Sequence, residues 1–280
     1  MVRLTLPFAP QTMARADVFA ARQYPCQAFD NVIDPVLNID WFEMKGPTFP
    51  AHPHAGFSAV TYLFAESPNG LRNRDSLGGE HVIRPGGLHW SRASRGMLHE
   101  ETPLLGGGAV QGLQIFANLP AANQADEPGA FPVAPEEVRI ETGQGWLSRI
   151  AVDGTAIGSA LNALPAPIRV QEVSIQARGS YQFKVPPGWG GILIALKGSL
   201  SLPNGTELRG NEAIGFAAEG GGLFRVAATD GEARIAIVAG QQLNQPIHVL
   251  GPLMLASAEA LSAARDHVAG LAIPTNAAPS

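Results

Sequence analysis

Turn residues punctuate the whole chain at short intervals, and this spacing constrains the fold more than any other feature. The 280 residues include 32 glycines and 23 prolines, and turns at 67–70, 85–87, 186–188 and 203–205 separate short apolar runs. Strands that are separated by turns about every 8–12 residues are typical of β-sandwiches and barrels. Patterns for long helices are nearly absent, so the sequence predicts an all-β protein.

A proline-rich segment divides this strand pattern into two halves. Residues 119–137 (LPAANQADEPGAFPVAPEE) carry four prolines and show no periodicity, which indicates a linker. A chain of this length accommodates two domains, each with its own core. We therefore expect a first domain over residues 1–125 and a second over residues 138–280.

One helix is predicted, near the C-terminus. Ser257 can serve as its N-cap, Glu259 complements the positive end of the helix dipole, and Gly270 can end it. Apolar residues at 260, 261, 264 and 268 lie at helical spacing and form a stripe, which we expect to pack against a barrel. The tail after Ile273 is expected to be disordered.

Two short pairs of metal-binding side chains distinguish the first half. His52 and His54 are separated by one residue, as are His99 and Glu101. Seven histidines in 280 residues give roughly 0.2 His-x-His pairs by chance, so the second pair matters more than the first. Successive strand side chains alternate between faces, so each pair points to one face and Glu100 to the other. Two adjacent strands would place three imidazoles and one carboxylate around one point, which indicates a transition-metal site with positions left for water or substrate.

A weak internal repeat indicates that only the first half carries these ligands. The segment GMLHEE (96–101) aligns with GGLFRV (221–226), so that Phe224 and Val226 correspond to His99 and Glu101. The region of the His-Pro-His pair falls near residues 185–187. The second domain is therefore expected to have the same framework without the ligands, and we predict one metal per chain.

Longer motifs surround the ligand pairs. They are DPVLNIDWF (34–42), FPAHPHAGFSAVTY (49–62), LHWSRASRGMLHEETP (88–103), GLQIFANLP (112–120) and GPLMLASAEAL (251–261). Together they resemble the pirin family, which consists of bicupins of the cupin superfamily. The resemblance implies two cupin-type β-barrels, with one metal, usually iron, in the N-terminal barrel. It implies that His52, His54, His99 and Glu101 hold that metal.

The chain departs from the usual pirin motif directly after the histidines. It reads HPHAGFS where pirins commonly continue HPHRGFE, so Ala55 replaces a charged residue and Ser58 replaces the glutamate of the first cupin motif. That glutamate is not a pirin ligand, so we expect the metal site to persist with altered charge around it. Three neutral imidazoles and one carboxylate suit Fe(II), the first choice by resemblance, with Mn, Ni, Cu and Zn as alternatives.

The resemblance implies alternative functions. The first is an oxidoreductase that resembles quercetin 2,3-dioxygenase, in which a flavonol, a small aromatic substrate, loses its hydroxyl proton to Glu101 and reacts with dioxygen. The second is a non-enzymatic, redox-sensing regulator that binds a transcription factor or a metabolic enzyme. A third is a metal-stabilised barrel that acts on an unrelated small molecule. An apolar pocket open to the metal would favour an enzyme, and a closed mouth with an exposed patch elsewhere would favour the regulator.

Charge and composition exclude other classes of function and bear on location. The formal net charge is −5 and the basic residues form no cluster, so direct nucleic-acid binding is not expected. The single cysteine, Cys26, excludes an internal disulfide, fits a reducing cytoplasm, and is expected to be buried or inert. There is no secretory-leader pattern and no run of 18 apolar residues, so we expect a cytoplasmic protein without a membrane span.

Two further histidines lie in the first half. His81 and His89 each lack a ligand two residues away. We expect them to be surface or hydrogen-bonded histidines and not metal ligands.

Overall fold

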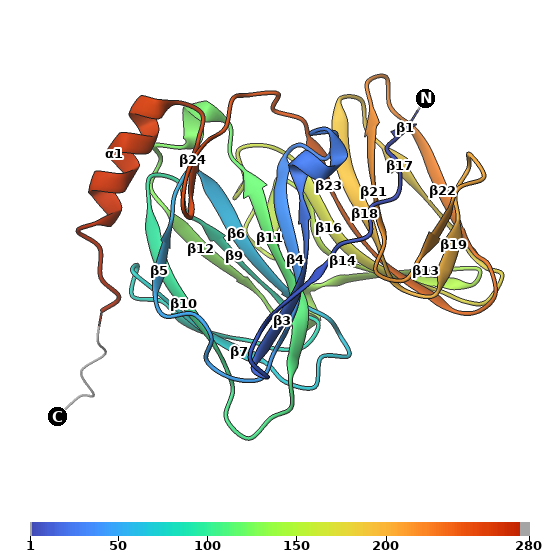
Figure 1. Ribbon diagram of the computed structural model, residues 1–280, viewed down its shortest axis with the longest axis horizontal. Coiled ribbons are helices and arrows are strands. Elements are labelled where there is room, and N and C mark those ends of the chain that lie inside the picture. The colour runs from blue at the N-terminus through green and yellow to red at the C-terminus, as the bar shows by residue number, and fades with distance from the viewer. Residues whose placement is uncertain (1, 275–280) are drawn as a thin grey trace. The chain divides into compact units, whose positions relative to one another are not determined.

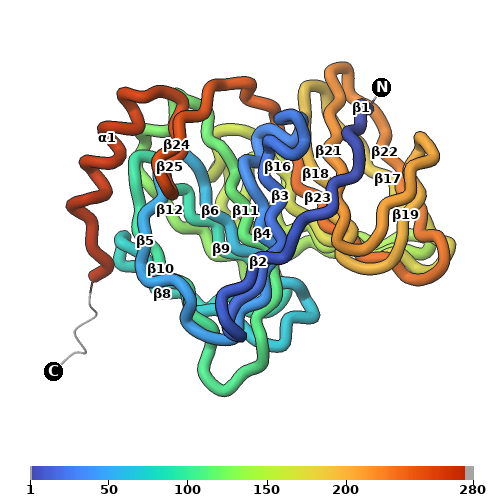
Figure 2. Tube along the Cα trace, viewed as in Figure 1, coloured from blue at the N-terminus to red at the C-terminus, as the bar shows by residue number. Residues whose placement is uncertain are grey.

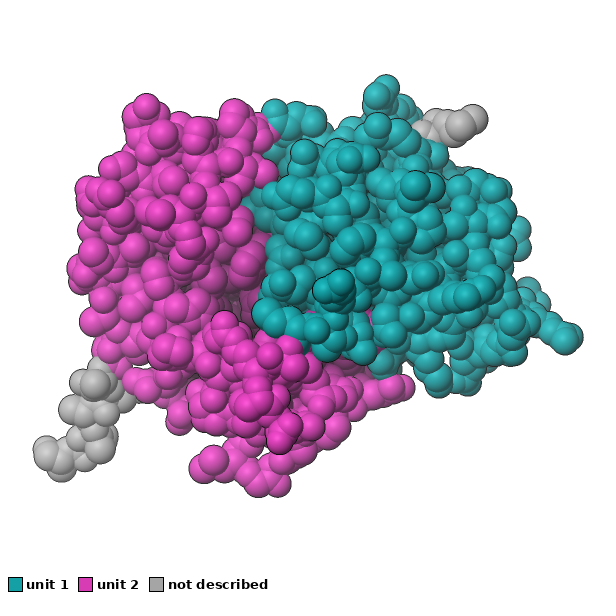
Figure 3. Space-filling view, viewed as in Figure 1, with its two compact units in different colours: residues 1–13, 22–40, 136–244 teal, residues 14–21, 41–135, 245–280 magenta. Residues whose placement is uncertain are grey.

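The structure, a computed structural model, describes residues 2–274, so the predicted tail lies outside the described residues from residue 275 onward. The chain forms two compact units (Figure 3). Strands make up most of both units, and the short helix α1 (Ala258–Val268) is the one α-helix in residues 2–274. The predicted all-β fold with a single C-terminal helix is confirmed. No helix in this described range has the length and apolar character needed to cross a membrane.

The two units interleave along the chain. Unit 2 contains residues 14–21, 41–135 and 245–280, whereas unit 1 contains residues 1–13, 22–40 and 136–244. The chain passes from unit 2 to unit 1 inside the predicted linker. The units differ from the expected boundaries of 1–125 and 138–280 at both ends of the chain, because the terminal segments pair with strands that are distant in sequence.

Two antiparallel sheets form the barrel of unit 2, which we call the first barrel (Figure 1). The larger sheet runs in the order β12 (Gly129–Val133), β9 (Leu88–Arg92), β6 (Phe57–Leu63), β11 (Val110–Asn118), β4 (Val36–Met44), β3 (Phe19–Pro25) and β2 (Thr12–Arg15). The smaller sheet runs in the order β5 (His52–His54), β10 (Met97–Pro103), β7 (Leu71–Asp75) and β8 (Glu80–Ile83). Strand β12 lies inside the predicted linker, between the short 3-10 helices η2 (Ala121–Asn123) and η3 (Pro135–Glu137). The chain passes between the units within β2, β3 and β4.

The barrel of unit 1, the second barrel, repeats this arrangement. Its larger sheet runs in the order β1 (Arg3–Leu4), β21 (Ala213–Ala218), β18 (Trp189–Lys197), β23 (Ala233–Gln241), β16 (Ile168–Ile175), β14 (Trp146–Gly154) and β13 (Arg139–Gly143), and β15 (Ala156–Ile157) pairs with β14. Its smaller sheet runs in the order β17 (Ser180–Val185), β22 (Gly222–Ala228), β19 (Ser199–Ser201) and β20 (Glu207–Arg209). A 3-10 helix, η1 (Cys26–Phe29), also belongs to this unit. Each barrel therefore pairs a large sheet with a four-stranded one, as the internal repeat predicts.

The C-terminal segment of unit 2 packs on the first barrel next to the His-Pro-His strand (Figure 2). Strands β24 (His248–Leu250) and β25 (Leu253–Leu255) form a hairpin, and α1 follows it. The Ser257 side chain accepts a hydrogen bond from the Ala260 amide at 3.1 Å, which confirms the predicted N-cap. The apolar stripe of α1 (Ala260, Leu261, Ala264 and Val268) packs with Ala55, Leu253 and Leu255.

Candidate metal centre

The two predicted ligand pairs lie on adjacent antiparallel strands. His99 on β10 is directly opposite His52 on β5, and Met97 is opposite His54. Strand β5 is an edge strand of its sheet, where Pro53 is tolerated because a proline without an N–H costs no ladder hydrogen bond there. The alternation of strand side chains then directs the three imidazoles to one face.

The three imidazoles converge. One ring nitrogen from each of His52, His54 and His99 lies within 4.8 Å of the other two. The Nε2 atoms of His54 and His99 are 3.1 Å apart. Two nitrogens bound to one ion at about 2.1 Å and at right angles to each other would be about 3.0 Å apart. The three histidines therefore fit a transition-metal ion.

The surroundings keep these imidazoles in the form that binds metals. His52 donates a hydrogen bond from Nδ1 to the carbonyl of Pro50 at 3.0 Å, which leaves its Nε2 with a free electron pair. Burial, with His52 as the second cause, lowers the pKa of His54 to about 3. Burial also lowers the pKa of His99, and to a smaller extent that of His52. Neutral imidazole is the ligand form, so the site is prepared for a cation at neutral pH.

Glu101 lies inside the same barrel but outside the three-histidine cluster. Its carboxylate accepts a hydrogen bond from the Thr61 hydroxyl, with the two carboxylate oxygens at 2.7 and 2.9 Å. Burial raises the pKa of Glu101 to about 7, and the hydrogen bond from Thr61 opposes this shift. The structure thus brings the three predicted histidines together, and it shows Glu101 held by Thr61.

Two features of this site have no obvious signal in the sequence. Thr61 reaches Glu101 across 40 positions of the chain, and a threonine inside a strand motif is unremarkable by itself. The C-terminal hairpin supports the loop after His54, where Ala55 accepts a hydrogen bond from the Met254 amide at 3.0 Å. Gly56 has a φ of +86°, and a Cβ there would lie 1.9 Å from the carbonyl oxygen of Met254.

The two departures from the pirin motif point away from the histidines. Ala55 is buried against Leu253 and Leu255. Ser58 alternates with Phe57, whose ring lies 5.2 Å from that of His54, so Ser58 projects from the opposite face of β6. Strand alternation therefore places the Ser58 side chain away from the ligands, and the altered charge around the site stays a prediction.

His89 is the clearest correction to the sequence analysis. It is 1% exposed, and neither of its ring nitrogens has a hydrogen-bond partner among residues 2–274. The ring of His81, which is partly exposed, lies near it in a tilted arrangement, with ring centroids 5.4 Å apart. The prediction of a surface or hydrogen-bonded histidine is wrong for His89, because His89 lies directly opposite Thr61 and shares the sheet face that Thr61 directs towards Glu101.

The single cysteine behaves as expected. Cys26 is buried, and burial followed by the nearby charge of Asp34 raises the pKa of its thiol. A thiol with a raised pKa is a poor nucleophile at neutral pH.

Comparison with known proteins decides the family. The family model named Pirin matches residues 20–117, and the Pirin C-terminal cupin domain matches residues 170–269. The chain belongs to the pirin family. It is 32% identical over 253 residues to a Pseudomonas aeruginosa protein named "Putative quercetin 2,3-dioxygenase", with 85% of this chain and 86% of that protein covered. It is also 27% identical over 236 residues to human pirin, with 83% and 80% covered.

Solved structures share the bicupin fold of this pirin-family chain. A quercetin 2,3-dioxygenase from Acinetobacter baumannii superimposes with a TM-score of 0.83 and 22% identity, over 95% of this chain and 96% of that one. A bacterial pirin from Escherichia coli in complex with nickel(II) superimposes with a TM-score of 0.64 and 14% identity, over 86% and 99%. At these identities the likeness shows the fold, and the chemistry of this chain is argued from its own residues.

Proposed function

We propose that this protein is an iron-dependent oxygenase that resembles quercetin 2,3-dioxygenase, with His52, His54, His99 and Glu101 holding one metal. The convergence of three neutral imidazoles within 4.8 Å is the observation that carries the proposal. The name of the P. aeruginosa relative supports the substrate class, a flavonol that reacts with dioxygen. The single buried cysteine supports a location in a reducing compartment, the cytoplasm.

The residues of the site have distinct tasks. Phe57 and Phe116 lie against the His54 ring, with centroids 5.2 and 5.4 Å away, and they keep water from that side of the site. The bond from His52 to the Pro50 carbonyl orients the His52 ring. A bound Fe(II) would supply Lewis acidity and one-electron chemistry towards dioxygen. Glu101 would accept the flavonol hydroxyl proton on a carboxylate oxygen, while Thr61 holds that carboxylate in place.

The test is an aerobic assay of the iron-loaded protein with a panel of flavonols, in which oxygen uptake and loss of flavonol absorbance are recorded together. The same protein loaded with Zn(II), which has no redox chemistry, is the control. We expect uptake of oxygen that is stoichiometric with flavonol loss, and only with iron.

The regulator is the second candidate, and the burial of the histidines favours it. His54 and His99 are 4% and 3% exposed, so the protein shields most of the histidine cluster from solvent, which suits a redox-sensing metal. An iron-loaded protein that consumes no oxygen with any flavonol would overturn the enzyme in favour of this regulator.

A further inference from the structure

A group of polar side chains lies inside the first barrel beside the histidines, and the proposed reaction uses only part of it. The group consists of Thr61 on β6, Asn73 on β7, His81 on β8, His89 on β9 and Glu101 on β10. We call these five residues the polar ring. Thr61 and Glu101 already have tasks in the proposed reaction, whereas the other three have none.

Each of the five side chains is next to two others of the polar ring, either as a cross-strand neighbour or through a direct contact. Thr61 lies directly opposite His89, and Asn73 lies directly opposite both His81 and Glu101 on its two neighbouring strands. Directly opposite residues project from the same face of a sheet, with Cβ atoms about 4.5–5.5 Å apart. The direct contacts are the ring contact of His81 with His89 at 5.4 Å and the hydrogen bond from Thr61 to Glu101 at 2.7 Å. Five strands therefore direct polar groups towards one region of the barrel interior.

Several of these polar atoms are buried without a partner. Asn73 is 0% exposed, and neither atom of its amide group forms a hydrogen bond within the described chain. The same holds for both ring nitrogens of His89 within residues 2–274, and for Nε2 of the adjacent Gln114. A buried polar group without a hydrogen bond costs about 1–3 kcal/mol, and native proteins leave few such groups. So many in one place indicate an occupant that bonds to them.

The chemistry of the ring selects an uncharged occupant. Burial, and then the neighbouring His81, lower the pKa of His89 to about 3, so its ring is neutral and offers one donor and one acceptor. The Asn73 amide offers two donor hydrogens and an acceptor oxygen. Arg72 and Arg74 alternate with Asn73 along β7 and project from its other face, so they do not compensate an anion in the ring. Hydroxyl groups, which donate and accept at one atom, match this mixture.

The position of the ring connects it with the metal centre. Glu101 belongs both to the ring and to the proposed ligand set, and His99 lies two residues away on the same face of β10. A molecule that binds the metal through one oxygen would therefore lie close to the polar ring. The matching region of the second barrel contains the apolar side chains Phe224 and Val226.

We propose that the polar ring is the part of the substrate site that binds hydroxyl groups, so that the substrate carries hydroxyls beyond the one that would meet the metal. This inference rests on the proposed flavonol reaction. Quercetin, with several hydroxyl groups, has the required chemistry. The flavonol 3-hydroxyflavone keeps the metal-facing hydroxyl and ketone but lacks the remaining hydroxyls.

The experiment compares the affinity of the iron-loaded protein for these two flavonols under argon, where binding occurs without turnover. The dissociation constant is obtained from the shift of flavonol absorbance. We expect the unaltered protein to bind quercetin at least about tenfold more tightly, because a site built to bond hydroxyls discriminates against analogues that lack them. Asn73→Leu and His89→Leu should each reduce this ratio to within about twofold and leave the dissociation constant of 3-hydroxyflavone unchanged. Asn204→Leu, at an exposed turn of unit 1, is the matched control and should keep the original ratio.

Thermal unfolding separates this role from a structural one. Asn73→Leu removes a buried amide that has no partner in residues 2–274, so we expect an unchanged or higher unfolding midpoint together with the lost preference. Equal affinity of the unaltered protein for the two flavonols, or an unchanged ratio in both variants, would overturn the assignment of the ring and leave the proposed function standing, with ordered water as the occupant. Binding of neither flavonol would overturn the proposed function and this inference with it.

Discussion

At one pair of matching strand positions, the two barrels have aromatic rings of different chemistry. In the first barrel His52 lies opposite His99, and in the second barrel Phe183 lies opposite Phe224. The rings of His52, His54 and His99 have centroids 4.8–4.9 Å apart. The rings of Phe183, Phe216 and Phe224 have centroids 5.2–5.5 Å apart. The same sheet arrangement thus supports a cluster of three imidazoles in one barrel and a cluster of three phenyl rings in the other.

This difference shows that the backbone of the fold does not decide the chemistry of the interior. Val185 occupies the position in the second barrel that corresponds to His54. His54 lies opposite the residue two positions before His99, and Val185 lies opposite the residue two positions before Phe224. The second barrel buries an apolar core that includes Tyr181, Leu193 and Ile237. At the corresponding interior positions the first barrel instead buries the polar side chains His54 and His99.

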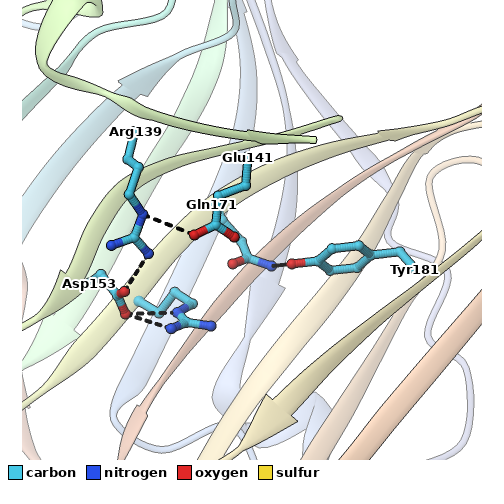
Figure 4. Close-up of polar contacts among 6 residues, drawn as sticks. Arg139, Glu141, Asp153, Gln171 and Tyr181 are labelled. Atoms are coloured by element: carbon cyan, nitrogen blue, oxygen red, sulfur yellow. Dashed lines mark hydrogen bonds and ion pairs between the residues drawn. The ribbon is translucent and has the colours of Figure 1, made fainter. Parts of the chain in front are cut away.

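The second barrel contains a buried polar contact to Tyr181 of this core and a separate group of partly exposed charged side chains. Figure 4 shows Arg139 bonded to Glu141 and Asp153. Arg169 also forms an ion pair with Asp153, at 2.7 Å. Gln171 donates to the hydroxyl of Tyr181 at 3.1 Å in the same view. The arginine and carboxylate side chains are at least partly exposed, so we expect them to contribute to stability and not to metal binding.

The largest expected effect is a loss of metal affinity when one imidazole of the first barrel is replaced by the phenyl ring found at the matching position of the second. His99→Phe gives the first barrel the residue of the second at that position. We expect metal affinity to fall at least about 100-fold, because loss of a ligand should exceed the 10–100-fold cost of losing an outer-shell partner. Metal content by elemental analysis and metal-free unfolding by calorimetry check this result. His248→Ala, on the exposed strand β24, should keep its metal, and full occupancy in His99→Phe would contradict the assignment.

Glu101 and its counterpart Val226 differ in charge, and the second prediction removes that charge alone. Glu101→Gln keeps the size and one coordinating oxygen, so iron should bind more weakly yet detectably. After correction for bound iron, the rate of flavonol turnover should fall at least roughly tenfold, since general bases contribute about 10²–10⁴-fold. Oxygen uptake per iron measures this rate. An unchanged rate per iron would mean that Glu101 is a ligand only and that another group takes the proton.

Support of the first barrel by the C-terminal hairpin gives a third prediction. Gly56 and Gly78 have nearly equal φ values, +86° and +84°, but only Gly56 has atoms, those of Met254 and Leu255, where a Cβ would lie. Gly78→Ala should cost about 1 kcal/mol of unfolding free energy from backbone strain. Gly56→Ala should cost a further 1–3 kcal/mol or so from the clash. Denaturant unfolding checks both, and equal losses would show that the hairpin moves aside without cost.

The smallest expected effect is on the free energy of unfolding, when the charge of Asp153 is removed. Burial raises its pKa, but the bonds from Arg169 and Arg139 outweigh burial and lower the pKa overall. A lowered folded-state pKa stabilises the protein above the unfolded value of about 3.8, and this contribution is lost as the pH falls through the lower folded value. Asp153→Asn should therefore cost less than about 1 kcal/mol at pH 7. Denaturant titrations should show that the two proteins, unaltered and Asp153→Asn, have the same unfolding free energy at pH values below the folded-state pKa of Asp153. The metal content of the variant should stay unchanged. A loss of metal in this variant would show that the barrels are not chemically separate.

The sequence by itself determined the strands, the repeat and the three histidines. Turn residues and alternation are local signals, so they predict strands and the capped helix at Ser257 without knowledge of the fold. The placement of each histidine on one face of its strand is also a local signal. The pairing of the two strands was then enough to bring the three rings together. The family resemblance rests on the same segments.

Only the tertiary structure decided what surrounds these residues. The hydrogen bond from Thr61 to Glu101, the hairpin against Ala55 and the burial of His89 all join positions far apart in the chain. The division into units was likewise decided by pairing of terminal segments with distant strands. Such contacts depend on which strands become neighbours, and a linear pattern of turns and alternation does not encode that choice. The local pattern therefore predicts which side chains share a face, while the assembled sheets decide which faces meet.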